Sequence, residues 1–204
     1  MKKVLVLFAH PRTDRSECNV PLAEAARSVD GVTFVDLYAE YPTFEIDVDR
    51  EQARLVDHDV IVFQHPVYWY STPAILKEWQ DLVLEYGFAY GAEGRALAGK
   101  WGLNAVTCGA RREVYTRDGA YQHELRTFLL PIEQTMLLCH MRVLPPFALF
   151  AAGHADDEGR LSAHTKDYVR LLRALVEDRV DLERASAAKT LSDDLDRWLT
   201  GGTR

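Results

Sequence analysis

Short apolar segments alternate with helical patterns along this chain, and that alternation constrains the fold more than any other feature. The first, third and fourth segments are apolar almost throughout, as in strands that are buried on both faces. Strands that alternate with helices predict an α/β fold, a parallel sheet with right-handed crossovers and helices on both faces. For five strands the common doubly wound order is 2-1-3-4-5. The predicted strands are residues 3–9, 32–38, 59–63, 101–107 and a segment within 141–150 that Pro145-Pro146 terminates or bulges.

The helical patterns complete the predicted architecture. Pro131 inside the fourth of them predicts a break or a kink, because proline removes a backbone donor and clashes with the preceding turn. We expect helices that start within Ser16–Asn19 and end before Gly31, and then at 49–56, 73–86, 122–140 and 161–177, with a short capped helix within 192–199. Residues 1–178 are predicted to form one domain, and 179–204 a partly helical C-terminal extension of it.

Composition argues against several kinds of partner and site. The net charge of −7 argues against a nucleic-acid partner, which requires a basic face. The three cysteines are odd in number and show no paired spacing, so we expect no disulfide framework, no zinc site and a reducing cytoplasm. His154, His164 and the acidic run 156–158 lack ligand spacing, so no metal is expected. No apolar run approaches the ~18 residues of a membrane span, which predicts no direct membrane insertion.

An aromatic stretch follows the third predicted strand, where Tyr68, Trp69 and Tyr70 lie between His65-Pro66 and Ser71-Thr72-Pro73. Open α/β sheets bind ligands outside the carboxyl ends of their strands. These side chains are therefore candidates to contact a flat ligand. They are equally suited to closing the top of the core, which is the commoner role of large aromatic residues.

Two further loops should meet the aromatic stretch in this strand order. In the loop 10–19, Ser16 and Asn19 precede a helix whose free amides and dipole favour a phosphate, although both are also ordinary caps. The loop lacks the glycines of a Walker or dinucleotide turn. In the loop 107–121, Thr107-Cys108-Gly109-Ala110 lets backbone amides approach a planar ring. A phosphate at one end and an aromatic plane at the other predict non-covalently bound FMN.

The same segments resemble a known family. His10-Pro11, Ser16…Asn19, the block from His65 to Pro73 and Tyr86-Gly87-Phe88-Ala89-Tyr90-Gly91 resemble the flavodoxin-like NAD(P)H:quinone oxidoreductases. The resemblance extends over about residues 1–178. It is strongest to the bacterial branch that includes cytosolic ancillary subunits of glutathione-gated potassium efflux antiporters.

The resemblance implies roles for individual residues. The phosphate and ribityl side would be held by His10, Ser16, Glu17, Cys18 and Asn19, and the isoalloxazine by Val67, Tyr68, Trp69, Tyr70, Thr107, Cys108, Gly109 and Ala110. The family has Thr-Thr-Gly-Gly in the last segment, so Cys108 and Ala110 depart from it, and a positive φ at Ala110 would be strained. Tyr115 matches the family's catalytic tyrosine. Tyr121 replaces its histidine, for which His123 is a candidate stand-in.

The activity that the resemblance implies is hydride transfer from NAD(P)H to the flavin N5 and then to a quinone. The alternative is a regulatory ancillary subunit of a potassium efflux antiporter with secondary reductase activity, peripheral at the inner membrane through that partner. A one-electron carrier is a third hypothesis. Family members are typically homodimers, and loops 41–48 and 108–123 are the candidate contacts. Arg111-Arg112 is a candidate to contact the 2′-phosphate of NADPH. Cys108 is either a redox thiol or a small residue that lines the core.

Overall fold

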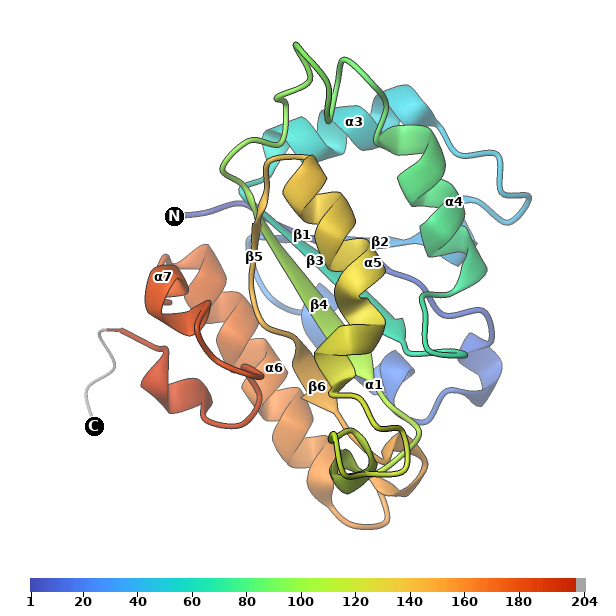
Figure 1. Ribbon diagram of the computed structural model, residues 1–204, viewed down its shortest axis with the longest axis vertical. Coiled ribbons are helices and arrows are strands. Elements are labelled where there is room, and N and C mark those ends of the chain that lie inside the picture. The colour runs from blue at the N-terminus through green and yellow to red at the C-terminus, as the bar shows by residue number, and fades with distance from the viewer. Residues whose placement is uncertain (201–204) are drawn as a thin grey trace.

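A twisted parallel sheet lies between two helical layers in the computed structural model, which describes residues 1–200 (Figure 1). The strand order is β2-β1-β3-β4-β5, and β6 also pairs with β4. The predicted fold class and order are therefore confirmed. The strands are β1 (Val4–Phe8), β2 (Val32–Asp36), β3 (Val60–Pro66), β4 (Trp101–Thr107), β5 (Arg142–Val143) and β6 (Phe147–Leu149).

The fifth predicted strand is split into β5 and β6, which pair with the two ends of β4. Leu144, Pro145 and Pro146 separate them, and neither proline has an N–H group to donate to a neighbouring strand. The predicted interruption at the double proline is confirmed. The turn after β6 therefore reaches the same sheet end as the loops after β1, β3 and β4.

Helices cover both faces of the sheet, and each face has its own core. One core packs under α3, α4 and α5, and the other under α1, α6 and α7 (Figure 1). The helices are α1 (Asn19–Arg27), α2 (Leu37–Glu40), α3 (Val48–Asp57), α4 (Ala74–Val83), α5 (Leu125–Leu138), α6 (Arg160–Val176) and α7 (Leu182–Ala185). Single 3-10 turns lie at η1 (Thr13–Arg15), η2 (Arg112–Val114), η3 (Ala152–His154) and η4 (Leu195–Arg197).

Two strand boundaries differ from the prediction by two residues or more, and the ends of β1 and the start of β3 differ by one. β3 continues through Gln64, His65 and Pro66, because these residues still pair with β4 up to Thr107. β2 stops at Asp36, whose carboxylate accepts hydrogen bonds from the next residues, at 3.1 Å from the Tyr38 amide nitrogen. That side-chain cap turns residues 37–38, predicted as strand, into the start of α2.

Three helix predictions also need correction. α5 spans 125–138 rather than 122–140 and is continuous through Pro131, so the predicted break does not occur, and a kink there stays a prediction. Thr127, whose carbonyl loses its helical partner, is exposed, and water can satisfy that group. α4 ends at Val83 rather than near 86, and the segment 192–199 contains only the 3-10 turn η4.

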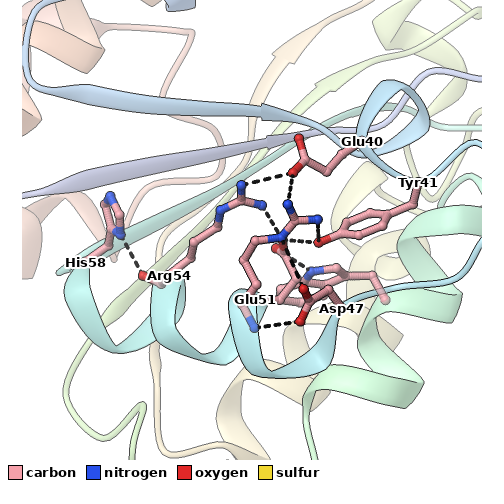
Figure 2. Close-up of polar contacts among 8 residues, drawn as sticks. Glu40, Tyr41, Asp47, Glu51, Arg54 and His58 are labelled. Atoms are coloured by element: carbon pink, nitrogen blue, oxygen red, sulfur yellow. Dashed lines mark hydrogen bonds and ion pairs between the residues drawn. The ribbon is translucent and has the colours of Figure 1, made fainter.

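A buried charged cluster joins α2, α3 and α4 (Figure 2). The fully buried Glu51 carboxylate accepts hydrogen bonds from the Tyr41 hydroxyl at 2.6 Å and from the Trp79 indole N–H at 3.0 Å, and it pairs with Arg54. Arg54 also contacts Glu40 at 3.2 Å. Burial, followed by the bond to Glu51, raises the pKa of Tyr41 to about 12. Every oxygen of this buried carboxylate therefore has a partner.

Candidate functional site

Four loops at the carboxyl end of the sheet line one cavity of about 280 Å³. The loops follow β1, β3, β4 and β6, so residues far apart in the sequence meet where open parallel sheets bind ligands. The lining residues are His10, Arg15, Ser16, Glu17, Cys18, Asn19, Pro66, Val67, Tyr68, Thr107, Gly109, Ala152 and Gly153.

The N-terminus of α1 forms one end of this cavity. The Ser16 hydroxyl oxygen accepts a hydrogen bond from the Asn19 amide at 3.1 Å, so Ser16 is a cap and also lines the cavity. Among residues 1–200, no hydrogen bond is formed by the amides of Glu17 and Cys18. Free amides at the positive end of a nine-residue helix favour an anion such as a phosphate.

His10 connects the first loop to the aromatic stretch. Its Nδ1 accepts a hydrogen bond from the Arg12 amide at 3.1 Å, which places the ring proton on Nε2. Nε2 then donates to the Tyr68 hydroxyl at 3.2 Å. Burial lowers the pKa of His10, so the ring is neutral near pH 7.

Asn19 and Thr107 form the floor of the cavity. The Asn19 side-chain nitrogen donates to the Thr107 hydroxyl oxygen at 2.9 Å, whereas the Asn19 side-chain oxygen is buried without a partner in the described chain. Behind them, the Gln64 amide contacts the Asn19 carbonyl at 3.4 Å and accepts from the Tyr168 hydroxyl at 3.1 Å. Buried polar atoms normally have a partner, so this oxygen is a candidate acceptor for a ligand hydroxyl.

The aromatic stretch is a tight turn. Tyr68 and Ser71 exchange two backbone hydrogen bonds of 3.0 Å, and Trp69 and Tyr70 between them have φ of 48° and 63°. Positive φ is strained for such side chains. Trp69 is 93% exposed at the tip, and Tyr70 packs on Tyr121 and Phe128. The structure therefore brings Val67 and Tyr68 into the cavity lining, but not Trp69 and Tyr70.

In the loop after β4, too, some of the predicted residues line the cavity and others pack into the core. Gly109 lines the cavity, and a Cβ at this position would meet open space. Cys108 is fully buried, and burial raises the pKa of its thiol to about 12, which favours a core residue over a redox thiol. Ala110 has no positive φ, so the strain considered from the sequence does not arise, and its side chain packs toward the core.

Tyr115 does not line the cavity. It packs against Tyr121, Phe128 and Phe150 with ring centroids 5.0–6.0 Å apart, and burial raises its pKa. His123, the candidate stand-in, lies edge-on to Phe128 at 6.0 Å. In this arrangement the tyrosine packs among other aromatic side chains and does not face the cavity.

Four lining residues were not predicted from the sequence: Arg15, Pro66, Ala152 and Gly153. Pro66 was adjacent to the predicted segment. Ala152 and Gly153 follow β6, and the split of the fifth strand hid which residues would reach the sheet end. Gln64 lies directly behind the cavity-lining residues. Its position as a polar residue at the end of an apolar strand is the sequence feature that could have indicated this role.

These features fit FMN. Amides at the α1 N-terminus suit a phosphate, the Asn19 oxygen suits a ribityl hydroxyl, and the open space beside Gly109 suits a flat ring. In the part of the chain that the structure describes, no three His, Cys, Asp or Glu residues group as a metal site. Within residues 1–200, no helix combines the length and apolarity needed to cross a membrane.

Comparisons with known proteins agree with this geometry. The ancillary protein KefG of the glutathione-regulated potassium-efflux system of Yersinia pseudotuberculosis is 42% identical over 172 residues, which cover 84% of this chain and 94% of the relative. The general stress protein 14 of Treponema denticola, solved in complex with FMN, is 38% identical with a TM-score of 0.79, over 85% of this chain and 99% of that one. An NADPH-quinone reductase of P. pentosaceus is 26% identical with a TM-score of 0.74, over 83% and 97%.

The family Flavodoxin_2, described as having a flavodoxin-like fold, matches residues 2–172. The match ends within α6, before the C-terminal extension. This chain therefore belongs to the flavodoxin-like family, and its resemblance to quinone reductases and potassium-efflux ancillary proteins is confirmed.

Proposed function

We propose that this protein is an FMN-dependent NAD(P)H:quinone oxidoreductase. One observation carries the proposal: the loops after β1, β3, β4 and β6 line a single cavity with phosphate-type donors at one end and open space beside Gly109. FMN-bound and quinone-reductase relatives support it. When bound, FMN would supply the redox chemistry, namely hydride acceptance from NAD(P)H and delivery to a quinone.

The chain's own residues would bind and orient the cofactor. The amides of Glu17 and Cys18 would hold the phosphate, and the Asn19 oxygen would accept from a ribityl hydroxyl. The 3.2 Å hydrogen bond from His10 would hold the Tyr68 side chain in place on the side of the cavity that follows β3. Amides beside Gly109 would stabilise charge on the reduced ring, since fixed donors act strongly where water is excluded.

Tyr115 would support the site indirectly, because it does not line the cavity. Burial raises the pKa of its hydroxyl, and its ring contributes by packing against Tyr121. Trp69 would cover the acceptor from the exposed tip of the turn. Arg111 and Arg112 pair with Glu158 and Asp193, so the proposal does not use them for a 2′-phosphate.

Cofactor binding tests the proposal. Purified protein should bind one FMN per chain, seen by quenching of flavin fluorescence, and oxidise NAD(P)H when a quinone is added. Ser16→Ala should weaken FMN binding. Ser28→Ala at the other end of α1, where the hydroxyl donates to the Ala25 carbonyl, is the matched control and should leave it unchanged. A protein that cannot be loaded with FMN would overturn the assignment.

A second function is favoured by the 42% identity to a potassium-efflux ancillary protein. In this role the chain would be a homodimeric cytoplasmic subunit at the inner membrane, attached through an antiporter. Potassium efflux from cells that contain the antiporter, with and without this protein, tests the role. A Trp69→Ala variant that loses reductase activity and still activates efflux would separate the two functions, and light scattering would report the dimer.

A further inference from the structure

The segment after α6 packs back onto the sheet edge (Figure 1, red). It lies beyond the residues that match the family. Leu191, Leu195 and Trp198 are buried against the core under α6. The Leu191 amide donates to the Pro146 carbonyl at 2.9 Å, and the Ser192 hydroxyl bonds both the amide and the carbonyl of Ala148 in β6, at 3.2 and 3.1 Å. The extension is thus fixed to the strand edge independently of any ion pair.

This anchored segment presents Asp193 to the loop after β4. Its two carboxylate oxygens pair with the two terminal nitrogens of Arg112, and the distance from Nη1 of Arg112 to Oδ2 of Asp193 is 2.8 Å. The Arg112 guanidinium also lies over the Phe150 ring, 4.5 Å from the centroid. A two-point contact with a carboxylate, together with stacking on a ring, fixes the plane of the guanidinium. A lysine ammonium or a single hydrogen bond would not fix an orientation in this way.

A continuous set of aromatic contacts runs from there to the turn after β3. Ring centroids are separated by 5.4 Å for Phe150–Tyr115, 5.0 Å for Tyr115–Tyr121 and 5.4 Å for Tyr121–Tyr70. We call Tyr70, Tyr115, Tyr121 and Phe150 the aromatic wall. Tyr70 belongs to the turn that bears Trp69. The wall therefore links the extension to the acceptor side of the candidate site.

We propose that Asp193 is a positioning residue that, by orienting Arg112, fixes the aromatic wall and thereby sets the affinity for the electron acceptor. The proposal rests on the reductase function proposed above. Exposed ion pairs contribute little to global stability, so the effect belongs to the site and not to the fold. The FMN phosphate end lies on other elements, so cofactor affinity should not change.

Steady-state kinetics of the FMN-loaded enzyme test this role. Asp193→Asn should raise the KM for a quinone such as menadione about threefold to tenfold, with kcat and FMN affinity nearly unchanged. Asp193→Glu should restore most of the affinity. Asp196→Asn is the matched control, since Asp196 lies in the same segment but pairs with Arg170 of α6. Equal KM values for Asp193→Asn and wild type, or an equal rise in Asp196→Asn, would overturn the proposal.

Hydrogen exchange gives a readout that does not need activity. Asp193→Asn should speed exchange of amides in residues 110–121 and reduce the near-ultraviolet circular dichroism of the aromatic wall, while Asp196→Asn changes neither. If FMN does not bind, the reductase function fails, but this exchange experiment still judges the positioning role. Unchanged exchange in Asp193→Asn would refute it.

Discussion

Two buried polar side chains, Glu51 and Asn19, differ in how completely the chain satisfies them. Glu51 is surrounded by the Tyr41 hydroxyl, the Trp79 indole and Arg54 (Figure 2). The Asn19 side-chain oxygen is buried without a partner within the described chain, and Asn19 is one of the residues that line the cavity. A polar group with every partner supplied by the protein serves the fold, whereas one left incomplete beside a cavity indicates a ligand.

Glu51→Ala should have the largest effect on stability. It leaves the Tyr41 O–H and the Trp79 N–H without their acceptor and removes one of the two carboxylates that pair with Arg54, so we expect a loss of about 3 kcal/mol in the free energy of unfolding. Urea denaturation measures it. FMN affinity of the folded fraction should not change. A loss below about 1 kcal/mol would mean that the cluster is not the structural element described here.

The imidazole of His164, which stacks on the Phe147 ring with centroids 4.4 Å apart, extends the comparison to pH. Burial lowers the pKa of His164 to about 4, whereas the unfolded chain titrates near 6.5. The unfolded state therefore binds more protons between these values, and stability should fall by about 2 kcal/mol as the pH drops from 6.5 to 4. His164→Gln should flatten that slope in thermal melts. His123→Gln, at an exposed position, should not, and equal slopes in both variants would contradict the assignment.

Asn19→Leu should separate ligand binding from stability. The substitution removes the acceptor and the bond to Thr107, so FMN affinity should fall about tenfold, which corresponds to roughly 1.4 kcal/mol, with a smaller change in unfolding. Gln80→Leu is the control, because this buried amide donates to the Leu76 carbonyl in its own helix and does not line the cavity. Fluorescence titration compares them, and equal FMN affinities in both variants would refute the role of Asn19.

Trp69→Gly should have the smallest effect on the fold, and it should be stabilising. Trp69 has a φ of 48° and is exposed, so glycine relieves about 1 kcal/mol of backbone strain and loses little packing. Trp69→Ala, which keeps a Cβ at positive φ, should give no such gain. Reductase turnover should fall in both variants. A destabilised Trp69→Gly would show that the turn is not strained in solution.

The architecture could be predicted from the sequence because buried strands leave a strong apolar signal. β4 was predicted with its observed bounds, 101–107, and the order followed from the alternation with helices. The directions of individual side chains could not be predicted. Trp69 is exposed at the tip of a positive-φ turn and Tyr115 packs into an aromatic cluster, so neither side chain lines the cavity. Pro131 is tolerated because the carbonyl that it leaves without a helical partner belongs to Thr127, an exposed residue, where water can satisfy it.

A crystal structure of the protein grown with FMN tests the central claim most directly. We expect the phosphate at the amides of Glu17 and Cys18, a ribityl hydroxyl on the Asn19 oxygen and the ring beside Gly109. FMN bound elsewhere on the molecule, or a complex in which the Asn19 oxygen still lacks a partner, would contradict it.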